Sequence, residues 1–322
     1  MTAALTARRS GTILVTGASG FVGRPLVTAL ARAGYAIRAA SRNPQAAAFP
    51  AGVECVRLPD LAGEVDWRPL LAGITDVVHL ASATHDEPGI GVEVYDRVTR
   101  GALVELTQAA KAAGIRRLVL ISSIRAQTGI SSKDVVTEAA EPRPTDPYGR
   151  SKLEAEAVLR RSDVPHVTLR FVRIYGPGVK GHIATLMRLA RSPWPLPFGA
   201  FRSRRSLLAL ENAISAVRFA LDREEASGET YVVADLDPLT LPEIMTVLRS
   251  AIGRRPDVFP LPEALLGALL RLAGRADLWQ PLTQSLIVSP AKLLAAGWQP
   301  PVGTRTGLAT LMRAERGRFA AI

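Results

Sequence analysis

The stretch that decides the fold runs from residue 12 to residue 23 and reads TILVTGASGFVG. Its first five residues form a short apolar run, as expected of a strand buried on both faces. A glycine-rich turn follows, and then a helical stretch over residues 22–33 that ends at Gly34. Such a turn lets the backbone approach a pyrophosphate, which rests on the helix N-terminus. The pattern predicts dinucleotide binding by Gly17, Ser19, Gly20, Phe21, Val22 and Gly23.

The rest of the first half alternates between strand-like and helix-like segments. Strands are expected at residues 12–16, 35–40, 53–58, 76–80, 117–122 and 167–172, and helices at 22–33, 91–113 and 147–161. Strands separated by helices predict right-handed crossovers and a parallel sheet covered on both faces. The fold class is therefore α/β, a doubly wound parallel sheet of the Rossmann type.

After Tyr175 the regular alternation of strands and helices ends, and turn-forming Gly and Pro residues become frequent. Helices are expected at residues 182–191, 211–222, 242–252 and 262–273, with one strand at 229–234. We expect residues 1–175 to form the dinucleotide-binding domain and residues 176–322 a smaller, mostly helical substrate-binding lobe. Helix 211–222 is expected to pack back on the first domain, and the apolar stretch 263–272 to be a lid or core helix rather than a membrane contact.

Composition narrows the class of protein. The chain has 322 residues, 48% of them apolar, which is ample for a folded core. Cys55 is the only cysteine, so we expect no disulfide, and no Cys/His cluster is present for a metal. We expect neither a secretory signal nor a membrane span, and therefore a cytoplasmic protein. The net charge of +11 comes from scattered arginines without an aromatic-interleaved stripe, so nucleic acid is not an expected partner.

The end of the second expected strand bears on the choice of cofactor. The segment reads Ala40-Ser41-Arg42-Asn43 and holds no carboxylate that could bind the adenosine ribose of NAD. Arg42 offers a bidentate fork for a phosphate, and Ser41 a hydroxyl. These residues favour NADP, with NAD as the alternative, although an exposed arginine would be unremarkable in so Arg-rich a chain.

A second chemical signal is Tyr148-Gly149-Arg150-Ser151-Lys152. Asp146 can cap a helix that has Pro147 at its first position, which puts Tyr148 and Lys152 one turn apart on one face. An ammonium next to a phenol favours the phenolate, so Tyr148 can act as an acid/base group near neutral pH. Ser122 and Ser123 end the fifth strand, where one of them could donate a hydrogen bond to the reacting oxygen.

Together these residues resemble the extended short-chain dehydrogenase/reductases, in particular enzymes that epimerise, dehydrate or reduce nucleotide sugars. The resemblance covers nearly the whole chain. The matching stretches are Thr16 to Gly23, His79-Leu80-Ala81-Ser82, Leu120-Ile121-Ser122-Ser123-Ile124, Tyr148 to Lys152, Arg170, Ile174 to Gly181, Arg204-Arg205-Ser206-Leu207 and Gly297-Trp298-Gln299-Pro300.

The resemblance implies a Tyr/Lys/Ser catalytic set, a nucleotide-sugar substrate and a homodimer built on a four-helix contact. Further cofactor contacts are then expected at Asp60, Leu61, Leu80, Ala81, Ser82, Tyr148, Lys152 and Phe171, and substrate contacts at Ser123, Arg173, Lys180, His182 and Arg205. Arg205 matches the arginine that grips the diphosphate in relatives. The chain departs from the family pattern at Thr99, Ile124, Phe171 and His182, and with Ile124 in the usual place the serine role shifts to Ser123.

Several activities are compatible with this pattern. Reduction of a 4-keto sugar would consume NADPH, whereas epimerisation at C4 would return the same hydride and leave no net redox change. The missing acidic residue near Arg42 favours the reductase slightly. A dehydratase is disfavoured because its acid/base pair would fall at Arg125 and Ala126. A hydroxysteroid-type dehydrogenase and a non-catalytic cofactor-binding sensor or scaffold are the alternatives.

Overall fold

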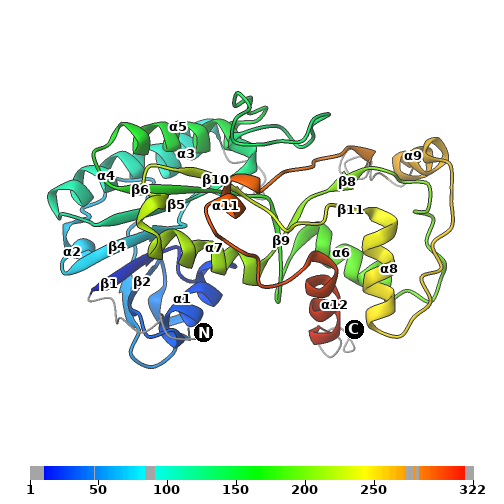
Figure 1. Cartoon of the computed structure of the whole chain (residues 1–322), viewed down its shortest axis with the longest axis horizontal. Helices are drawn as coiled ribbons and strands as arrows, with labels where there is room; N and C mark the ends of the chain where they lie inside the picture. Colours follow the sequence, from blue (N-terminus) through cyan, green and yellow to red (C-terminus); the bar gives the residue numbers. More distant parts are fainter. Residues whose placement is uncertain are drawn as a thin grey trace. The chain divides into compact units, whose positions relative to one another are not determined.

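The computed structural model describes residues 11–46, 48–83, 91–272, 274, 279 and 283–315 (Figure 1). The chain divides into two compact units. Unit 1 comprises residues 1–127, 141–170 and 214–231, and unit 2 comprises residues 128–140, 171–213 and 232–322. Among the described helices, none combines the length and the apolar character that crossing a bilayer requires.

A seven-stranded sheet organises the first unit. Its strands are β1 (Thr12–Thr16), β2 (Ala36–Ser41), β3 (Glu54–Arg57), β4 (Ile74–His79), β5 (Arg117–Ser123), β6 (His166–Phe171) and β10 (Thr230–Val233), in the order β10-β6-β5-β4-β1-β2-β3. β1 pairs in parallel with both β2 and β4, so the strand order reverses at β1. The carboxyl ends of strands at such a reversal are where doubly wound sheets bind ligands. The expected fold class is confirmed, and the strand expected at 229–234 forms as β10 beside β6.

Helices cover both faces of this sheet. Figure 1 shows α3 (Val92–Tyr95), α4 (Ala102–Ala112) and α5 (Pro147–Arg161) on one face and α1 (Gly23–Arg32) on the other. The short helix α2 (Arg68–Leu71) precedes β4. The last turn of α7 (Leu210–Asp222) contacts the unit 1 sheet region, because the Tyr35 hydroxyl donates to the Asp222 carboxylate at 2.8 Å.

One expected helix is not regular. The sequence predicts a single helix over residues 91–113, and the structure instead places a π-helical stretch over Asp96–Gly101 between α3 and α4. The prediction of one uninterrupted helix is therefore wrong in detail. A π turn holds one extra residue per turn, and such insertions often accompany functional sites.

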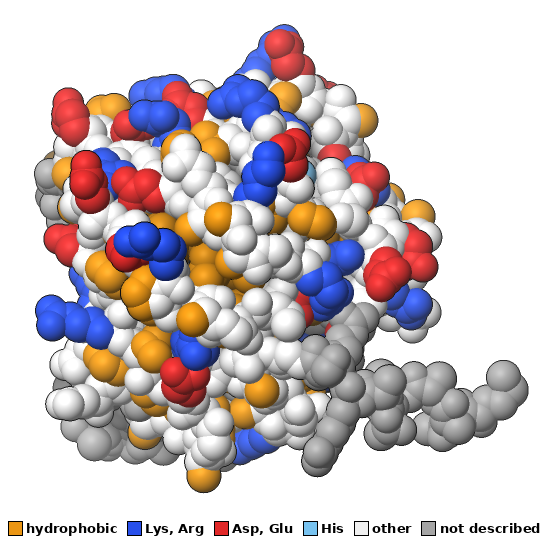
Figure 2. Space-filling view, turned by 90° about the vertical axis from the view of Figure 1, so that its left-hand side faces the viewer, with side chains coloured by type: hydrophobic (Ala, Val, Ile, Leu, Met, Phe, Trp, Pro, Cys, Tyr) orange, Lys and Arg blue, Asp and Glu red, His pale blue; other side chains and the backbone are white. Residues whose placement is uncertain are grey.

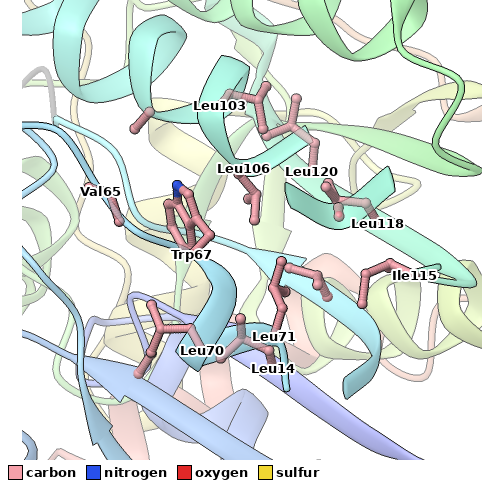
Figure 3. Packing of buried hydrophobic residues seen from close by; sticks show 14 of the residues in the cluster. Leu14, Val65, Trp67, Leu70, Leu71, Leu103, Leu106, Ile115, Leu118 and Leu120 are labelled. Carbon is pink, nitrogen blue, oxygen red and sulfur yellow. The ribbon is translucent and has the colours of Figure 1, made fainter. Parts of the chain in front are cut away.

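A hydrophobic core of unit 1 lies between the sheet and the helices α2, α4 and α5. Trp67 is fully buried there among leucines from β1, α2, α4 and β5. Figure 3 shows the Trp67 ring surrounded by the leucine side chains of this cluster. Each leucine buried in this way contributes roughly 1.5–3 kcal/mol to stability relative to an exposed one. This core holds rigid the strand ends that carry the site described below.

Unit 2 has its own core and combines helices with short strands. The helices are α6 (Gly181–Ala190), α8 (Leu241–Ala251), α9 (Glu263–Leu272), α11 (Ala291–Ala295) and α12 (Thr304–Ala314). β7 (Arg173–Tyr175) pairs with β9 (Leu207–Ala209), and β8 (Arg204–Arg205) pairs with β11 (Leu239–Thr240). The helices expected at 182–191, 242–252 and 262–273 are confirmed as α6, α8 and α9. The two- and three-residue strands are too short to show a period in the sequence.

Candidate active site

The glycine turn after β1 is packed so closely that side chains are excluded. Gly17 has a positive φ of +67°, and a Cβ there would lie 2.9 Å from the backbone nitrogen of Ala81. A Cβ on Gly23 would lie 2.2 Å from the Gly17 carbonyl oxygen. The turn closes through a 3.0 Å bond from Gly20 N to Gly17 O. This backbone fits the cradle that a dinucleotide pyrophosphate requires.

The N-terminus of α1 has no side chain that would offset the partial positive charge of the helix dipole there. Val22 occupies the N-cap without a side-chain hydrogen bond, and the first turn holds no acidic residue. Ser19 and Phe21 are exposed beside it. Because a helix N-terminus carries a partial positive charge, this arrangement suits an anion such as a phosphate.

The end of β2 carries an unsatisfied buried hydroxyl. Ser41 is 1% exposed, and its Oγ has no hydrogen-bond partner among the described residues. Arg42 follows it and is exposed. A buried hydroxyl without a partner is costly, so a ligand that bonds to it would remove that cost. Asp60 is exposed and accepts a bond from Ala62 N, while Leu61 belongs to the hydrophobic core.

The end of β4 is tied to β1 through Thr16. The Thr16 hydroxyl lies 3.0 Å from His79 Nδ1, and the backbone nitrogen of Ala81 donates to the same hydroxyl at 3.3 Å. Leu80 N donates to the Thr16 carbonyl oxygen. Burial, together with the charge of Lys152, lowers the pKa of His79 to about 3, so the ring is neutral at pH 7. Residues 80–82 are thereby fixed next to the glycine turn.

Lys152 is the central charge of the site. It is 4% exposed, and its Nζ donates to Ser82 Oγ at 3.0 Å and to the Ile121 carbonyl oxygen at 3.1 Å. The structure thus brings together three segments that are far apart in the sequence. Burial lowers the pKa of Lys152 to about 8, while the charge of Glu156 acts in the opposite direction.

Tyr148 lies one turn before Lys152 on α5. Asp146 caps this helix as expected, accepting from Gly149 N at 2.7 Å, and Pro147 occupies the first position. The Lys152 Nζ lies 5.9 Å from the centre of the Tyr148 ring. The half-buried Tyr148 ring also packs edge-on against Tyr95 from α3, with ring centres 6.1 Å apart.

The two serines at the end of β5 have different surroundings. Ser122 is buried and donates to Glu156 Oε1 at 2.5 Å. Ser123 is half-buried, and its Oγ accepts from Arg125 N at 3.2 Å, which leaves its hydrogen available to donate. The geometry therefore favours Ser123 over Ser122 as the donor to a reacting oxygen.

Sequence reasoning missed Tyr95, Glu156 and Gln127. Tyr95 lies directly before the π-helical stretch, whose extra residue leaves no mark in the apolar periodicity. Glu156 stands four residues after Lys152, so the same helical spacing that joins Tyr148 to Lys152 could have pointed to it. Nothing in the sequence around Gln127 indicates its buried bond to Arg170.

The residues expected to bind the substrate, other than Ser123, lie in unit 2. Arg173 Nη1 lies 3.4 Å from His182 Nδ1, so these two are brought together. Lys180 is exposed at the N-cap of α6. Arg205 lies on β8 and donates to the Ile130 carbonyl oxygen at 3.2 Å. Phe171, expected to contact the cofactor, is buried at the end of β6.

Comparison with known proteins identifies the class. Residues 13–234 match the NAD dependent epimerase/dehydratase family. The chain is 30% identical over 314 residues to a UDP-glucose 4-epimerase of Vibrio cholerae, covering 92% of each chain. It is 29% identical over 297 residues to a ceramide reductase of Caulobacter vibrioides, covering 90% of this chain and 86% of the relative.

A solved structure of MoeE5 with UDP-glucuronic acid and NAD shares the fold. Its TM-score is 0.75 at 24% identity, over 96% of this chain and 100% of that one. The chain belongs to the NAD-dependent epimerase/dehydratase family, and the expected resemblance to extended short-chain dehydrogenase/reductases is confirmed. It is accordingly an enzyme of the NAD-dependent type.

Proposed function

We propose that this enzyme transfers a hydride at C4 of a nucleotide-activated sugar, as a UDP-sugar 4-epimerase or a 4-keto-sugar reductase. The observation that carries the proposal is Lys152, held between Ser82 and Ile121 one helical turn from Tyr148. The Vibrio relative is a UDP-glucose 4-epimerase, and MoeE5 binds UDP-glucuronic acid with NAD. Both support a nucleotide sugar as the substrate.

The chemistry divides between the cofactor and three side chains. A bound nicotinamide supplies the hydride acceptor or donor. Tyr148 exchanges a proton with the C4 oxygen, and the ammonium of Lys152 favours the phenolate form that this exchange needs. Ser123 donates a hydrogen bond to the same oxygen. Lys152 also binds the nicotinamide ribose, and the neutral His79 ring holds the neighbouring strand end without adding a competing charge.

The cofactor is held by the strand ends of unit 1. Gly17, Gly20 and Gly23 offer backbone to the pyrophosphate, and Ser19, Phe21 and Val22 line the start of α1. Ser41 and Arg42 bind the adenosine ribose, where Arg42 can hold the extra phosphate of NADP. We propose NADP as the preferred cofactor and NAD as the alternative. Asp60, Leu61, Leu80, Ala81, Ser82 and Phe171 complete the proposed pocket.

We further propose residues 1–175 as the cofactor domain and residues 176–322 as the substrate-binding lobe, apart from residues 214–231, which belong to unit 1. Arg205 would grip the diphosphate through its bidentate guanidinium. Arg173, Lys180 and His182 would contribute further polar contacts to the nucleotide sugar. The 3.4 Å approach of Arg173 to His182 supports their acting together.

The experiment supplies purified enzyme with UDP-glucose, UDP-galactose or a UDP-4-keto sugar, each with NAD(H) or NADP(H). An epimerase interconverts the two hexoses without net change in cofactor absorbance, whereas a reductase oxidises reduced cofactor in a one-to-one ratio with the keto sugar. Tyr148→Phe should lose about 100-fold or more in kcat with cofactor affinity nearly intact. Wild-type turnover that survives this substitution would contradict the proposed role of Tyr148.

The ceramide reductase relative supports a second candidate, an enzyme that reduces a hydrophobic ketone or oxidises the matching alcohol, similar to hydroxysteroid dehydrogenases. The Ser122-Ser123-Ile124 motif is compatible with it. Keto-steroid and keto-sphingoid substrates belong in the same assay panel. Turnover of these, and of none of the nucleotide sugars, would replace the first candidate by the second. Cofactor binding without turnover of any substrate would favour a sensor or scaffold.

We also propose a homodimer that packs through α4 and α5. A groove of about 350 Å³ between these helices is lined by Val104, Thr107, Gln108, Lys111, Val158, Arg161, Ser162 and Asp163. Figure 2 shows the side of unit 1 on which α2 and α4 are drawn in Figure 1, with hydrophobic side chains gathered in its middle and charged ones around them. An apolar centre with a charged rim is typical of subunit interfaces.

A further inference from the structure

A buried carboxylate contacts Ser122, the neighbour in sequence of the proposed hydrogen-bond donor Ser123. Glu156 is on α5, one turn after Lys152, and its side chain is 0% exposed. Its Oε1 accepts from Ser122 Oγ at 2.5 Å and from Arg170 Nε at 3.0 Å. Its Oε2 accepts from Arg170 Nη2 at 2.5 Å. Every one of these contacts is within unit 1.

The contacts join α5 to two neighbouring strands. Arg170 is buried on β6 and also donates to the side chain of Gln127. Ser122 is on β5, directly after Ile121, whose carbonyl oxygen accepts from Lys152. Consecutive residues of β5 are therefore tied to consecutive turns of α5, Ile121 to Lys152 and Ser122 to Glu156.

Fold stability alone is a weak explanation for such a cluster. Removing two charges from water costs several kcal/mol per ion, and apolar replacements of a buried pair are often neutral or stabilising. The position of the pair favours another role. It fixes Ser122, and with it the strand end that carries both the Ile121 carbonyl and Ser123.

We propose that Glu156, paired with Arg170, is a positioning residue that holds β5 and Lys152 in register with Tyr148 and Ser123. The inference deepens the proposed function, and it rests on that function only in taking Tyr148 and Lys152 as the reacting groups. Glu156 acts through Ser122 and through its charge, and touches neither cofactor nor substrate.

The charges around Lys152 make the consequence specific. From α5 it faces the Glu156 carboxylate and the Tyr148 phenol, and from β4 the neutral His79. The Glu156 carboxylate is itself paired with Arg170 on β6, and Nη1 of Arg160 on α5 lies 3.6 Å from it. The negative charge of Glu156 favours the protonated form of Lys152. Without it the ammonium form of Lys152 is less favoured, and Tyr148 then loses part of the positive field that favours its phenolate.

The test replaces the whole pair rather than one member, so that no unpaired charge is left buried. The variant is Glu156→Leu/Arg170→Met, and the control is Glu154→Gln, on the same helix but exposed. Four quantities are measured: kcat and KM for the substrate of the enzyme, the urea midpoint, and the pH midpoint of the Tyr148 phenolate absorbance. The last needs no substrate and is obtained by subtracting the Tyr148→Phe spectrum in each background.

We expect the double variant to keep a urea midpoint close to that of the wild type. Its kcat should fall about tenfold with KM nearly unchanged, and the phenolate midpoint should rise by about one pH unit. The control should change none of these. A folded double variant with wild-type kcat and an unmoved phenolate midpoint would overturn the proposal.

Ser122→Ala covers the case in which the double variant does not fold, because it leaves the ion pair intact. It should lower kcat about threefold to tenfold without moving KM, since it cuts only the link to β5. Wild-type kcat in this variant would also overturn the proposal. If the wild type turns over no nucleotide sugar, the proposed function fails, while the phenolate titration still decides the role of Glu156.

Discussion

The ammonium of Lys152 donates to the carbonyl oxygen of Ile121 at 3.1 Å, and the lysine is only 4% exposed. A lysine so deeply buried is held charged by fixed acceptors rather than by water. This makes its protonation a property of the folded state, and a measurable consequence for stability follows.

This consequence is a dependence of the free energy of unfolding on pH. Burial lowers the pKa of Lys152 from 10.5 to about 8, so the folded chain releases this proton before the unfolded chain does. Below pH 8 both states carry the charge and folding includes the full cost of burying it, roughly 3 kcal/mol. Between pH 8 and 10.5 this cost disappears, so this group makes the free energy of unfolding rise.

Lys152→Met should remove that rise. We expect the variant to be more stable than the wild type at pH 7 and the difference to shrink as pH increases toward 10.5. Urea titrations at several pH values measure it, and Lys111→Met, at an exposed lysine, serves as the matched control. A constant difference across the whole range would show that the pKa of Lys152 is not lowered by burial.

The glycine turn gives a second prediction. A Cβ on Gly23 would meet the backbone of Gly17 and Ala18 at 2.2 and 2.9 Å, and backbone on both sides has no room to move. Gly23→Ala should therefore cost about 3 kcal/mol or more of stability and lower cofactor affinity by at least about tenfold.

Gly303→Ala is the matched control for this substitution. Gly303 has a φ of −75°, and a Cβ at this position would have no atom within 4 Å. The substitution should change stability by about 0.5 kcal/mol and leave cofactor binding unaltered. Equal effects of the two substitutions would mean that the turn at Gly23 is not specially constrained.

The sequence alone predicts the strand-turn-helix unit well, because its determinants are local. An apolar run, glycines at fixed spacing and a helix stop at Gly34 each act over a few residues. The same holds for Asp146, Tyr148 and Lys152, where a cap and a helical period fix which side chains share a face. Both predictions of local structure are confirmed.

Tertiary partners could not be predicted in the same way. The carboxylate of Glu156 meets Arg170 only because β6 lies next to β5 in the sheet. The π-helical stretch depends on one added residue in a helix whose apolar pattern reads as regular. The ion pair and the π-helical stretch both depend on the three-dimensional structure. Neither feature changes the pattern of residue types along the chain, so a sequence pattern cannot reveal them.

Cofactor choice is tested at Arg42. If its guanidinium binds the adenosine phosphate of NADP, Arg42→Ala should weaken NADP about tenfold to 100-fold and leave NAD nearly unchanged. Fluorescence titration with NADPH and NADH measures both affinities. Arg143→Ala, at an exposed arginine paired with Glu141, is the control. Equal weakening of the two cofactors would contradict the phosphate assignment.

The proposed dimer is tested at Val158, which lines the groove between α4 and α5 and is half-buried. Light scattering after gel filtration should give twice the 34.4 kDa mass for the wild type. Val158→Glu introduces a further charge into this groove and should give the single mass with an unchanged circular dichroism spectrum. A wild type that is monomeric at micromolar concentration would exclude this interface.

Unit 2 provides a test of its own core through Asp235. This buried carboxylate accepts bonds from the Tyr175 hydroxyl at 2.9 Å, from Ala209 N at 2.9 Å and from Asn212 Nδ2 at 2.7 Å. Asp235→Ala leaves three buried donors without this acceptor, and we expect a loss of about 3 kcal/mol in the free energy of unfolding. Asp237→Ala, at an exposed carboxylate two residues along the chain, should change stability by less than about 0.5 kcal/mol. Urea denaturation of both variants decides it, and equal stabilities would show that these three bonds are replaced by water when the carboxylate is removed.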